Sequence, residues 1–139
     1  MASNPAQTDL SEAPTGRLLF RKRHRLSRSL DYQAVFRDGV RKGRGPIVLV
    51  AQPNGLDHSR LGLSVPRRVG NAVVRGRVKR RLREVFRMHQ AQVPMGYDIV
   101  VAVRPHEALS IEEYESLLLD AWRAADATWR KRQRKAGDG

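Results

Sequence analysis

Cationic side chains crowd one segment of the chain at a spacing suited to phosphate binding. Residues 70–84 read Gly-Asn-Ala-Val-Val-Arg-Gly-Arg-Val-Lys-Arg-Arg-Leu-Arg-Glu. On a helix, Arg80, Arg83 and Arg87 share one face, flanked by Lys79. Like charges at this spacing repel each other by roughly 0.2–0.5 kcal/mol per pair, and arginine offers paired donors to phosphate oxygens. The segment therefore predicts a helix face that binds a phosphate backbone.

The alternative interpretation of such a segment is a solvated charged helix. Solvated helices usually intersperse acidic residues among the basic ones, and here only Glu84 interrupts the series. The whole chain carries 27 Lys and Arg against 14 Asp and Glu, a net charge of +13. Solubility alone is usually served by a net charge of about 2–8 in a small domain. The composition favours a polyanionic partner, with nucleic acid as the first candidate.

Residues that could perform catalysis are scattered rather than clustered. The chain has no cysteine, so it has no thiol nucleophile and no disulfide. Asp98 and Glu84 stand apart from other acids, whereas metal nucleases need clustered carboxylates. We interpret the single histidines as surface residues, and these are His24, His58, His89 and His106. The sequence therefore predicts no catalytic residue and no metal site in the protein, which disfavours a stand-alone nuclease.

A short helix precedes the basic segment. Ser27 or Ser29 is its expected N-cap, and Gly39 is expected to end it. The helix carries two aromatic residues four positions apart, Tyr32 and Phe36. By spacing alone, such a pair is more typical of a core than of a surface that stacks on bases.

Three strands are indicated. Residues 47–51 and 61–65 are separated by turn chemistry at 53–55, which predicts an antiparallel pair. Residues 98–103 form a nearly continuous apolar run, typical of a strand buried on both faces. We therefore expect 98–103 to be the central strand.

Two long helices complete the expected elements. The basic segment keeps a narrow apolar stripe from Val74 to Val85, and Pro94 and Gly96 break the chain after it. Ser110 and Glu113 form a capping box that starts the last helix near Ile111. The apolar stripe of this helix predicts core packing rather than a base-stacking platform, and comprises Tyr114, Leu117, Leu118, Ala121, Trp122, Ala125 and Trp129.

The order of helix, two strands, helix, strand and helix predicts one α+β domain over 18–130. Residues 1–17 are expected to be a disordered extension. Residues 131–139 are expected to be a basic flexible tail. The basic run 130–135 is either a solvated helix end, which we favour, or an extension that contacts RNA. The chain shows no signal peptide and no apolar run long enough to span a bilayer, so we expect a cytoplasmic protein without a membrane partner.

The basic segment resembles the signature helix of the bacterial ribonuclease P protein subunit, which reads approximately Gly-Asn-Ala-x-x-Arg-Asn-Arg-x-Lys-Arg-x-x-Arg-Glu. The similarity extends over roughly 25–129 and includes the segments 31–36, 61–65 and 97–105. Nine signature positions match, namely Gly70, Asn71, Ala72, Arg75, Arg77, Lys79, Arg80, Arg83 and Glu84.

The resemblance implies a function and a fold. It implies a subunit that binds the catalytic ribonuclease P RNA and the 5′ leader of precursor tRNA, with no small-molecule substrate. Cleavage of the leader is expected at the RNA, with Mg²⁺ as its metal. The implied fold is similar to that of ribosomal protein S5, with the strand 61–65, the basic helix and the strand 98–103 in a parallel unit of left-handed crossover.

The resemblance also implies site residues. The RNA-subunit contacts are expected at Asn71, Arg75, Arg77, Lys79, Arg80 and Arg83. The leader contacts are expected at Arg25, Tyr32 and Phe36, because single strands bind to aromatic rings beside a positive groove.

This chain departs from the family pattern at two positions. Gly76 replaces the usual asparagine of the signature helix, so no role of that amide is carried over. Val50 stands where relatives often place an aromatic residue facing the substrate groove. The competing hypothesis is a structural RNA binder of the ribosomal-protein kind, which would explain the charge but not the signature helix.

Overall fold

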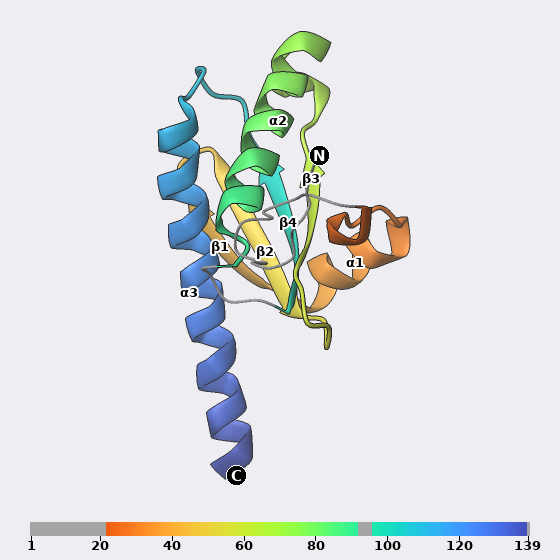
Figure 1. Ribbon diagram of the computed structural model, residues 1–139, viewed down its shortest axis with the longest axis vertical. Coiled ribbons are helices and arrows are strands. Elements are labelled where there is room, and N and C mark those ends of the chain that lie inside the picture. The colour runs from red at the N-terminus through yellow and green to blue at the C-terminus, as the bar shows by residue number, and fades with distance from the viewer. Residues whose placement is uncertain (1–21, 92–95, 139) are drawn as a thin grey trace, which may run out of the picture.

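A four-stranded mixed sheet organises the computed structural model, which describes residues 22–91 and 96–138 (Figure 1). The strands are β1 (Val40–Arg44), β2 (Ile47–Pro53), β3 (Arg60–Ser64) and β4 (Tyr97–Val103), in the order β1-β2-β4-β3. β4 runs antiparallel to β2 and parallel to β3. All of its residues except Ala102 are buried. The apolar run at 98–103 is thus the central strand, as predicted. The predicted extension 1–17 lies outside the described residues.

The predicted antiparallel pairing of 47–51 with 61–65 is wrong, because β4 lies between the two strands. Val101 is opposite Leu49 of β2 on one side and opposite Leu63 of β3 on the other. A strand that is apolar on both faces needs packing on both faces of the sheet, and residues of β4 belong to both the large and the small core.

β1 was not predicted, because its sequence Val-Arg-Lys-Gly-Arg lacks apolar alternation. It follows the α1 helix (Ser29–Asp38) directly and pairs antiparallel with β2 across a turn at Gly45, whose φ is 55°. Charged side chains on an edge strand discourage pairing with other chains. The basic residues of β1 therefore suit its place at the edge of the sheet.

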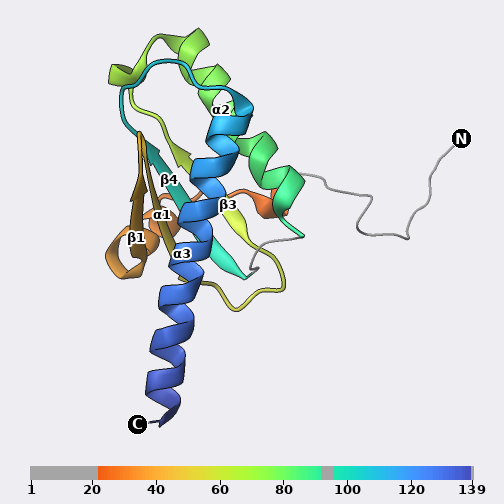
Figure 2. The ribbon, with the colours of Figure 1, turned by 90° about the vertical axis from the view of Figure 1, so that its left-hand side faces the viewer.

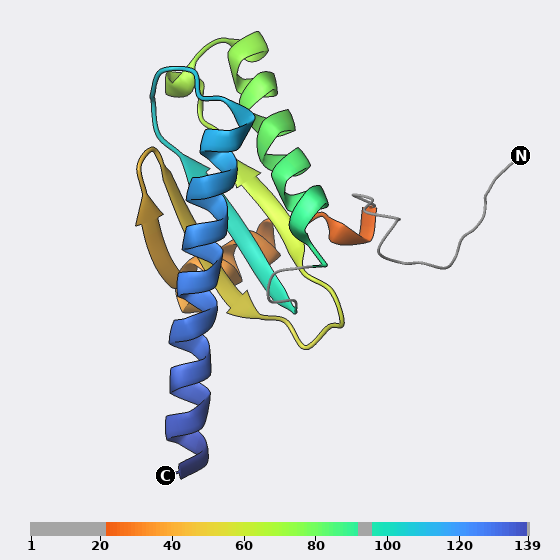
Figure 3. The same cartoon turned by 60° about the vertical axis from the view of Figure 1, so that its left-hand side comes forward.

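Helices cover both faces of the sheet (Figures 2 and 3). The α2 helix (Ala72–His89) and the α3 helix (Ile111–Asp138) pack on one face, in a core that includes Leu49, Ile99 and Val101. The α1 helix (Ser29–Asp38) lies on the other face, where Val35 packs on Val50 and Val100. Strand residues therefore alternate between a large core and a small one. The α+β architecture agrees with the prediction.

β3, α2 and β4 form the expected parallel unit. In Figure 1 the chain ascends β3, descends α2 in front of the sheet and ascends β4 to the left of β3. Figure 2 shows α2 and α1 on opposite sides of the sheet. This crossover is left-handed, as the family resemblance implied, whereas about 98% of such connections are right-handed.

The ends of the helices confirm some sequence signals and correct others. Arg28 occupies the N-cap position of α1 without a side-chain cap, so the predicted caps at Ser27 and Ser29 are wrong. Gly39 ends α1 as predicted, and a Cβ there would lie 2.4 Å from the Val35 carbonyl oxygen. The capping box of α3 is confirmed, because the Glu113 amide donates to Ser110 Oγ at 3.1 Å and the Ser110 amide donates to Glu113 Oε1 at 2.9 Å.

The α2 helix is held against α3 and the segment before it by an aromatic stack and two polar contacts. The rings of Phe86 and Trp122 lie 5.4 Å apart with their planes within 7°. His89 Nε2 contacts Glu115 Oε2 at 2.5 Å, and Arg81 donates to the Leu109 carbonyl at 2.5 Å. These contacts fix the rotation of α2, so its remaining basic residues face outward.

The α3 helix continues to Asp138, so residues 131–138 are helical where a flexible tail was predicted. Arg, Lys, Gln and Ala are strong helix formers and no proline interrupts them. Trp129 packs against the core, and its Nε1 donates to the Ala51 carbonyl at 2.8 Å. The core interpretation of Trp129 is therefore confirmed.

We predict that Phe86→Ala lowers the free energy of unfolding by about 3–5 kcal/mol, because it removes a fully buried ring from the stack with Trp122. Urea denaturation measures this loss. Leu30→Ala is the control, since Leu30 is 70% exposed and exposed substitutions usually change stability by no more than about 0.5 kcal/mol. A similar small loss for both variants would contradict the prediction.

Candidate nucleic-acid interface

Two of the six predicted RNA-subunit contacts have structural roles at the start of α2. The Asn71 side chain is the N-cap and accepts a hydrogen bond from the Val74 amide at 2.9 Å. Arg75 Nε donates to the Gly70 carbonyl at 3.1 Å, which leaves its terminal nitrogens for another partner. Both residues therefore stabilise the start of α2, and Arg75 also adds a positive charge there.

The other four predicted contacts lie outside the hydrophobic core against which α2 packs. Arg77 and Arg80 are exposed, and Lys79 and Arg83 are half-buried. A Cβ at Gly76 would lie 3.3 Å from an Arg80 guanidinium nitrogen. The Arg80 side chain thus lies beside position 76, where the resemblance led us to expect an asparagine. Gly76 gives this guanidinium room along the helix.

Lys79 and Arg83 line a hollow that also contains two of the predicted leader contacts, Arg25 and Tyr32. The hollow has a volume of about 300 Å³ and lies between α2, α1 and the free edge of β3. Its remaining lining comprises Leu26, Ser27, Leu61, Gly62 and Leu63. The structure therefore joins two sets of residues that the sequence assigned to different RNAs.

Tyr32 is positioned by the backbone of β3. Its hydroxyl accepts a hydrogen bond from the Leu63 amide at 3.1 Å. The ring lies directly over Gly62, where an added Cβ would be 2.6 Å from the hydroxyl and from Cζ. A glycine inside a strand often marks the close approach of another group. This signal in Leu61-Gly62-Leu63 was available in the sequence, but the prediction did not use it.

The segment before α1 extends the edge of the sheet. Arg25 forms a parallel bridge with Leu61, and the Leu26 amide donates to the Leu61 carbonyl at 2.9 Å. The Arg25 side chain is exposed beside the hollow. His24 is buried and contacts the His58 ring edge-on at 5.6 Å, so its interpretation as a surface histidine is wrong. Two flanking residues thus hold Arg25 in place.

Phe36 lies outside the hollow. It is half-buried one turn further along α1 and packs against the small core, and the Arg41 guanidinium carbon is 5.8 Å from its ring centroid. Val50 is fully buried beneath α1. An aromatic substrate contact at position 50 is therefore absent, and Tyr32 and Phe36 serve different parts of the sheet face.

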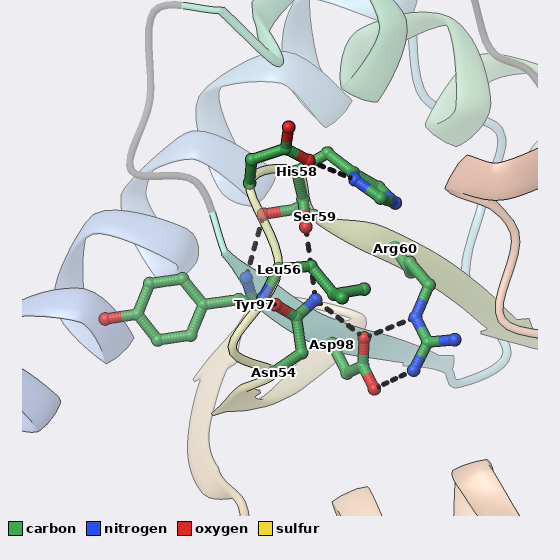
Figure 4. A network of polar contacts seen from close by, with 8 residues as sticks. Asn54, Leu56, His58, Ser59, Arg60, Tyr97 and Asp98 are labelled. Carbon is green, nitrogen blue, oxygen red and sulfur yellow. Dashed lines mark hydrogen bonds and ion pairs between the residues drawn. The ribbon is translucent and has the colours of Figure 1, made fainter.

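The two acids that were considered as metal ligands are held by arginines. Arg60 donates to both oxygens of Asp98, at 2.8 and 2.6 Å, and Asn54 Nδ2 donates to Oδ1 at 2.9 Å (Figure 4). This pairing raises the pKa of Arg60. A hydrogen bond from Arg87 lowers the pKa of Glu84. Both carboxylates are engaged in ion pairs.

Residues 22–91 and 96–138 contain no group of three or more His, Asp or Glu side chains that could hold a metal ion. Over the same residues, none of the helices is long and apolar enough to cross a membrane.

Comparisons with known proteins point to the same family as the signature helix. The family model described as Ribonuclease P matches residues 20–126. The ribonuclease P protein component of Brevibacillus brevis is 39% identical over 104 residues, covering 73% of this chain and 82% of the relative.

Solved structures show the same fold. The RNase P protein from Thermotoga maritima superimposes with a TM-score of 0.67 at 32% identity, covering 72% of this chain and 96% of that one. The RNase P protein from Staphylococcus aureus gives a TM-score of 0.67 at 30% identity, covering 73% and 94%. With its signature helix, its left-handed crossover and these matches, the chain belongs to the ribonuclease P protein family.

Proposed function

We propose that this chain is the protein subunit of a ribonuclease P holoenzyme, in which it binds the catalytic RNA and the 5′ leader of precursor tRNA. Membership of the family implies RNA binding and tRNA processing. The observation that carries the finer proposal is the hollow in which Arg25 and Tyr32 meet Lys79 and Arg83. One RNA backbone entering this hollow contacts groups from both predicted sites.

The outward face of α2 is the proposed contact with the RNA subunit. Arg77 and Arg80 are exposed, and neither forms a salt bridge within the described part of the chain. Phosphates between such arginines relieve their mutual repulsion and accept paired hydrogen bonds. Arg75 adds a further cation from the first turn of α2. Asn71 contributes indirectly, as the N-cap of the helix that carries these arginines.

The face of the sheet beside α1 is the proposed leader site. The Tyr32 ring is held over Gly62 with Arg25 nearby, and Phe36 offers a second half-buried ring toward β2. Aromatic rings beside cations are the usual way in which proteins bind single-stranded RNA. The separation of the two rings indicates that they contact different nucleotides of the leader.

Cleavage itself is proposed to occur on the RNA subunit with Mg²⁺. Among the described residues, Asp98 and Glu84 do not fit a magnesium site, since both are engaged by arginines and Mg²⁺ is usually bound through carboxylates and substrate phosphates. The protein contributes by reducing phosphate repulsion and by holding the leader. A purely structural RNA binder remains the alternative, and it would not distinguish precursor tRNA from mature tRNA.

We expect the purified protein alone to leave precursor tRNA intact, because no described cluster of side chains can carry out the cleavage. Adding the matching RNA subunit with Mg²⁺ should restore removal of the leader, measured by gel electrophoresis of labelled precursor. Cleavage by protein that survives stringent removal of RNA would overturn the assignment.

We expect Arg80→Gln combined with Arg83→Gln to weaken binding of the RNA subunit and to flatten its salt dependence. Each lost phosphate contact should lower the slope of log K against log[salt] by about 0.7–0.9. Filter binding over a series of salt concentrations measures the slope. Arg37→Gln is the matched control, since Arg37 is exposed on α1 and already pairs with Asp38. An equal slope for both variants would place the RNA contact elsewhere.

We expect Tyr32→Ala to reduce the affinity of the holoenzyme for precursor tRNA more than its affinity for mature tRNA, because only the precursor has a leader. Base stacking on an aromatic ring contributes about 1–3 kcal/mol. Tyr32→Phe keeps the ring and should retain most of the affinity, and Phe36→Ala should show the same preference at other leader nucleotides. Equal losses for both tRNAs with a lowered melting temperature would instead identify these rings as core residues.

A further inference from the structure

The last turns of α3 carry a basic surface that the proposed function does not use. Residues 130–137 are all exposed, and Trp129 is the last residue of the helix that packs against the core. We call residues 130–137 the C-terminal arm. The figures show this part of α3 extending past the end of the sheet, away from α2 (Figures 1 and 3). The family match ends at residue 126, so the arm lies outside the region shared with the family.

The arm is strongly and uniformly charged. It contains five cations and no acid, and these are Arg130, Lys131, Arg132, Arg134 and Lys135. At 100° per residue, four of them fall on the side opposite Trp122 and Ala125, and Arg132 widens the basic surface to more than half of the circumference. The remaining positions are Gln133, Ala136 and Gly137.

Among the described side chains, most of this charge has no acidic partner. Among the described residues, the salt bridges of the arm are limited to Arg130 with Asp126, at 2.9 Å. Arg132 lies over the Trp129 ring, with its guanidinium carbon 5.1 Å from the centroid. Arg130 with Arg134, and Lys131 with Lys135, are like-charged pairs at i, i+4, which oppose helix formation.

The helix therefore persists with only part of its charge compensated. Continuation from a packed helix avoids the cost of nucleation, and cations near a helix C-terminus are favoured by its dipole. A polyanion along the arm would remove the repulsion that remains. The arm has no apolar face, so it lacks the feature by which an amphipathic helix enters a membrane surface.

We propose that the C-terminal arm is a second RNA-binding surface, which contacts phosphates of the ribonuclease P RNA at a place separate from the contact made by α2. This inference rests on the proposed function, because it takes the RNA subunit as the partner. The N-terminal half of α2 and the arm lie at opposite ends of the molecule (Figure 1). Two separated basic surfaces on one rigid fold bind two separated stretches of backbone.

The first test compares two four-site variants of the full chain. One neutralises the arm by Lys131→Gln, Arg132→Gln, Arg134→Gln and Lys135→Gln, and the other keeps its charge by exchanging lysine and arginine at the same positions. Loss of two to four phosphate contacts should lower the salt slope for the RNA subunit by about 1.4–3.6 in the neutralised variant. The charge-preserving variant should bind like the wild type. Wild-type affinity and slope in the neutralised variant would overturn the proposal.

The second test does not depend on the stability of the arm. The chain has no cysteine, so Gln133→Cys and Val73→Cys each provide a single site for a tethered iron chelate that cleaves nearby RNA. Val73 is 65% exposed on the first turn of α2. We expect both probes to cleave the RNA subunit, at different nucleotides.

The outcomes separate the two proposals. Cleavage by the probe at Val73→Cys alone would overturn the proposal that the arm binds RNA, and would leave the proposed function intact. Cleavage of the same nucleotides by both probes would overturn the separate contact. Cleavage from neither probe, with no binding by the wild type, would overturn the proposed function together with the arm.

Discussion

Burial of β4 on both faces is the constraint on which the rest of the structure depends. Its apolar run requires one cover on the side of Val101 and another on the side of Val100. The α2 and α3 helices supply the first cover, and α1 supplies the second. Since α2 connects two adjacent parallel strands, its apolar stripe must face the sheet. The opposite side of α2 is then free to carry the basic residues that we propose as the RNA contact.

The basic surface of α2 is compatible with folding because tertiary contacts compensate for its repulsion. Phe86 stacks on Trp122, and Arg81 and His89 bind groups next to or on α3. Glu84 neutralises Arg87 on the helix itself. The arginines and lysines that still face outward are therefore fewer than the basic residues of the segment, because Arg81 and Arg87 are engaged within the protein. This set is the part of the helix that a phosphate backbone can reach.

The hollow beside β3 shows how one residue without a side chain organises a binding surface. Gly62 leaves room for the Tyr32 ring, and the hydroxyl of that ring then satisfies the Leu63 amide on the free edge of the sheet. The parallel bridge at Arg25 covers the same edge further along. The same contacts that cover the edge of β3 therefore also position Arg25 and Tyr32. The hollow adjoins the outward face of α2, with which it shares Lys79 and Arg83, whereas the C-terminal arm is a separate basic surface.

The sequence by itself determined the features that depend on local spacing. The helix from residue 72, the capping box at Ser110, the central strand and the signature of the family were all legible, because each depends on neighbours within a turn or on an uninterrupted apolar run. Tertiary structure decided what depends on distant pairing. Examples are the insertion of β4 between β2 and β3, the strand β1, and the burial of His24. The meeting of Tyr32 with Lys79 and Arg83 belongs to the same class, since their elements are joined only through the sheet. Periodicity reports which side of an element is apolar, but only the packed core determines which other element that side will face.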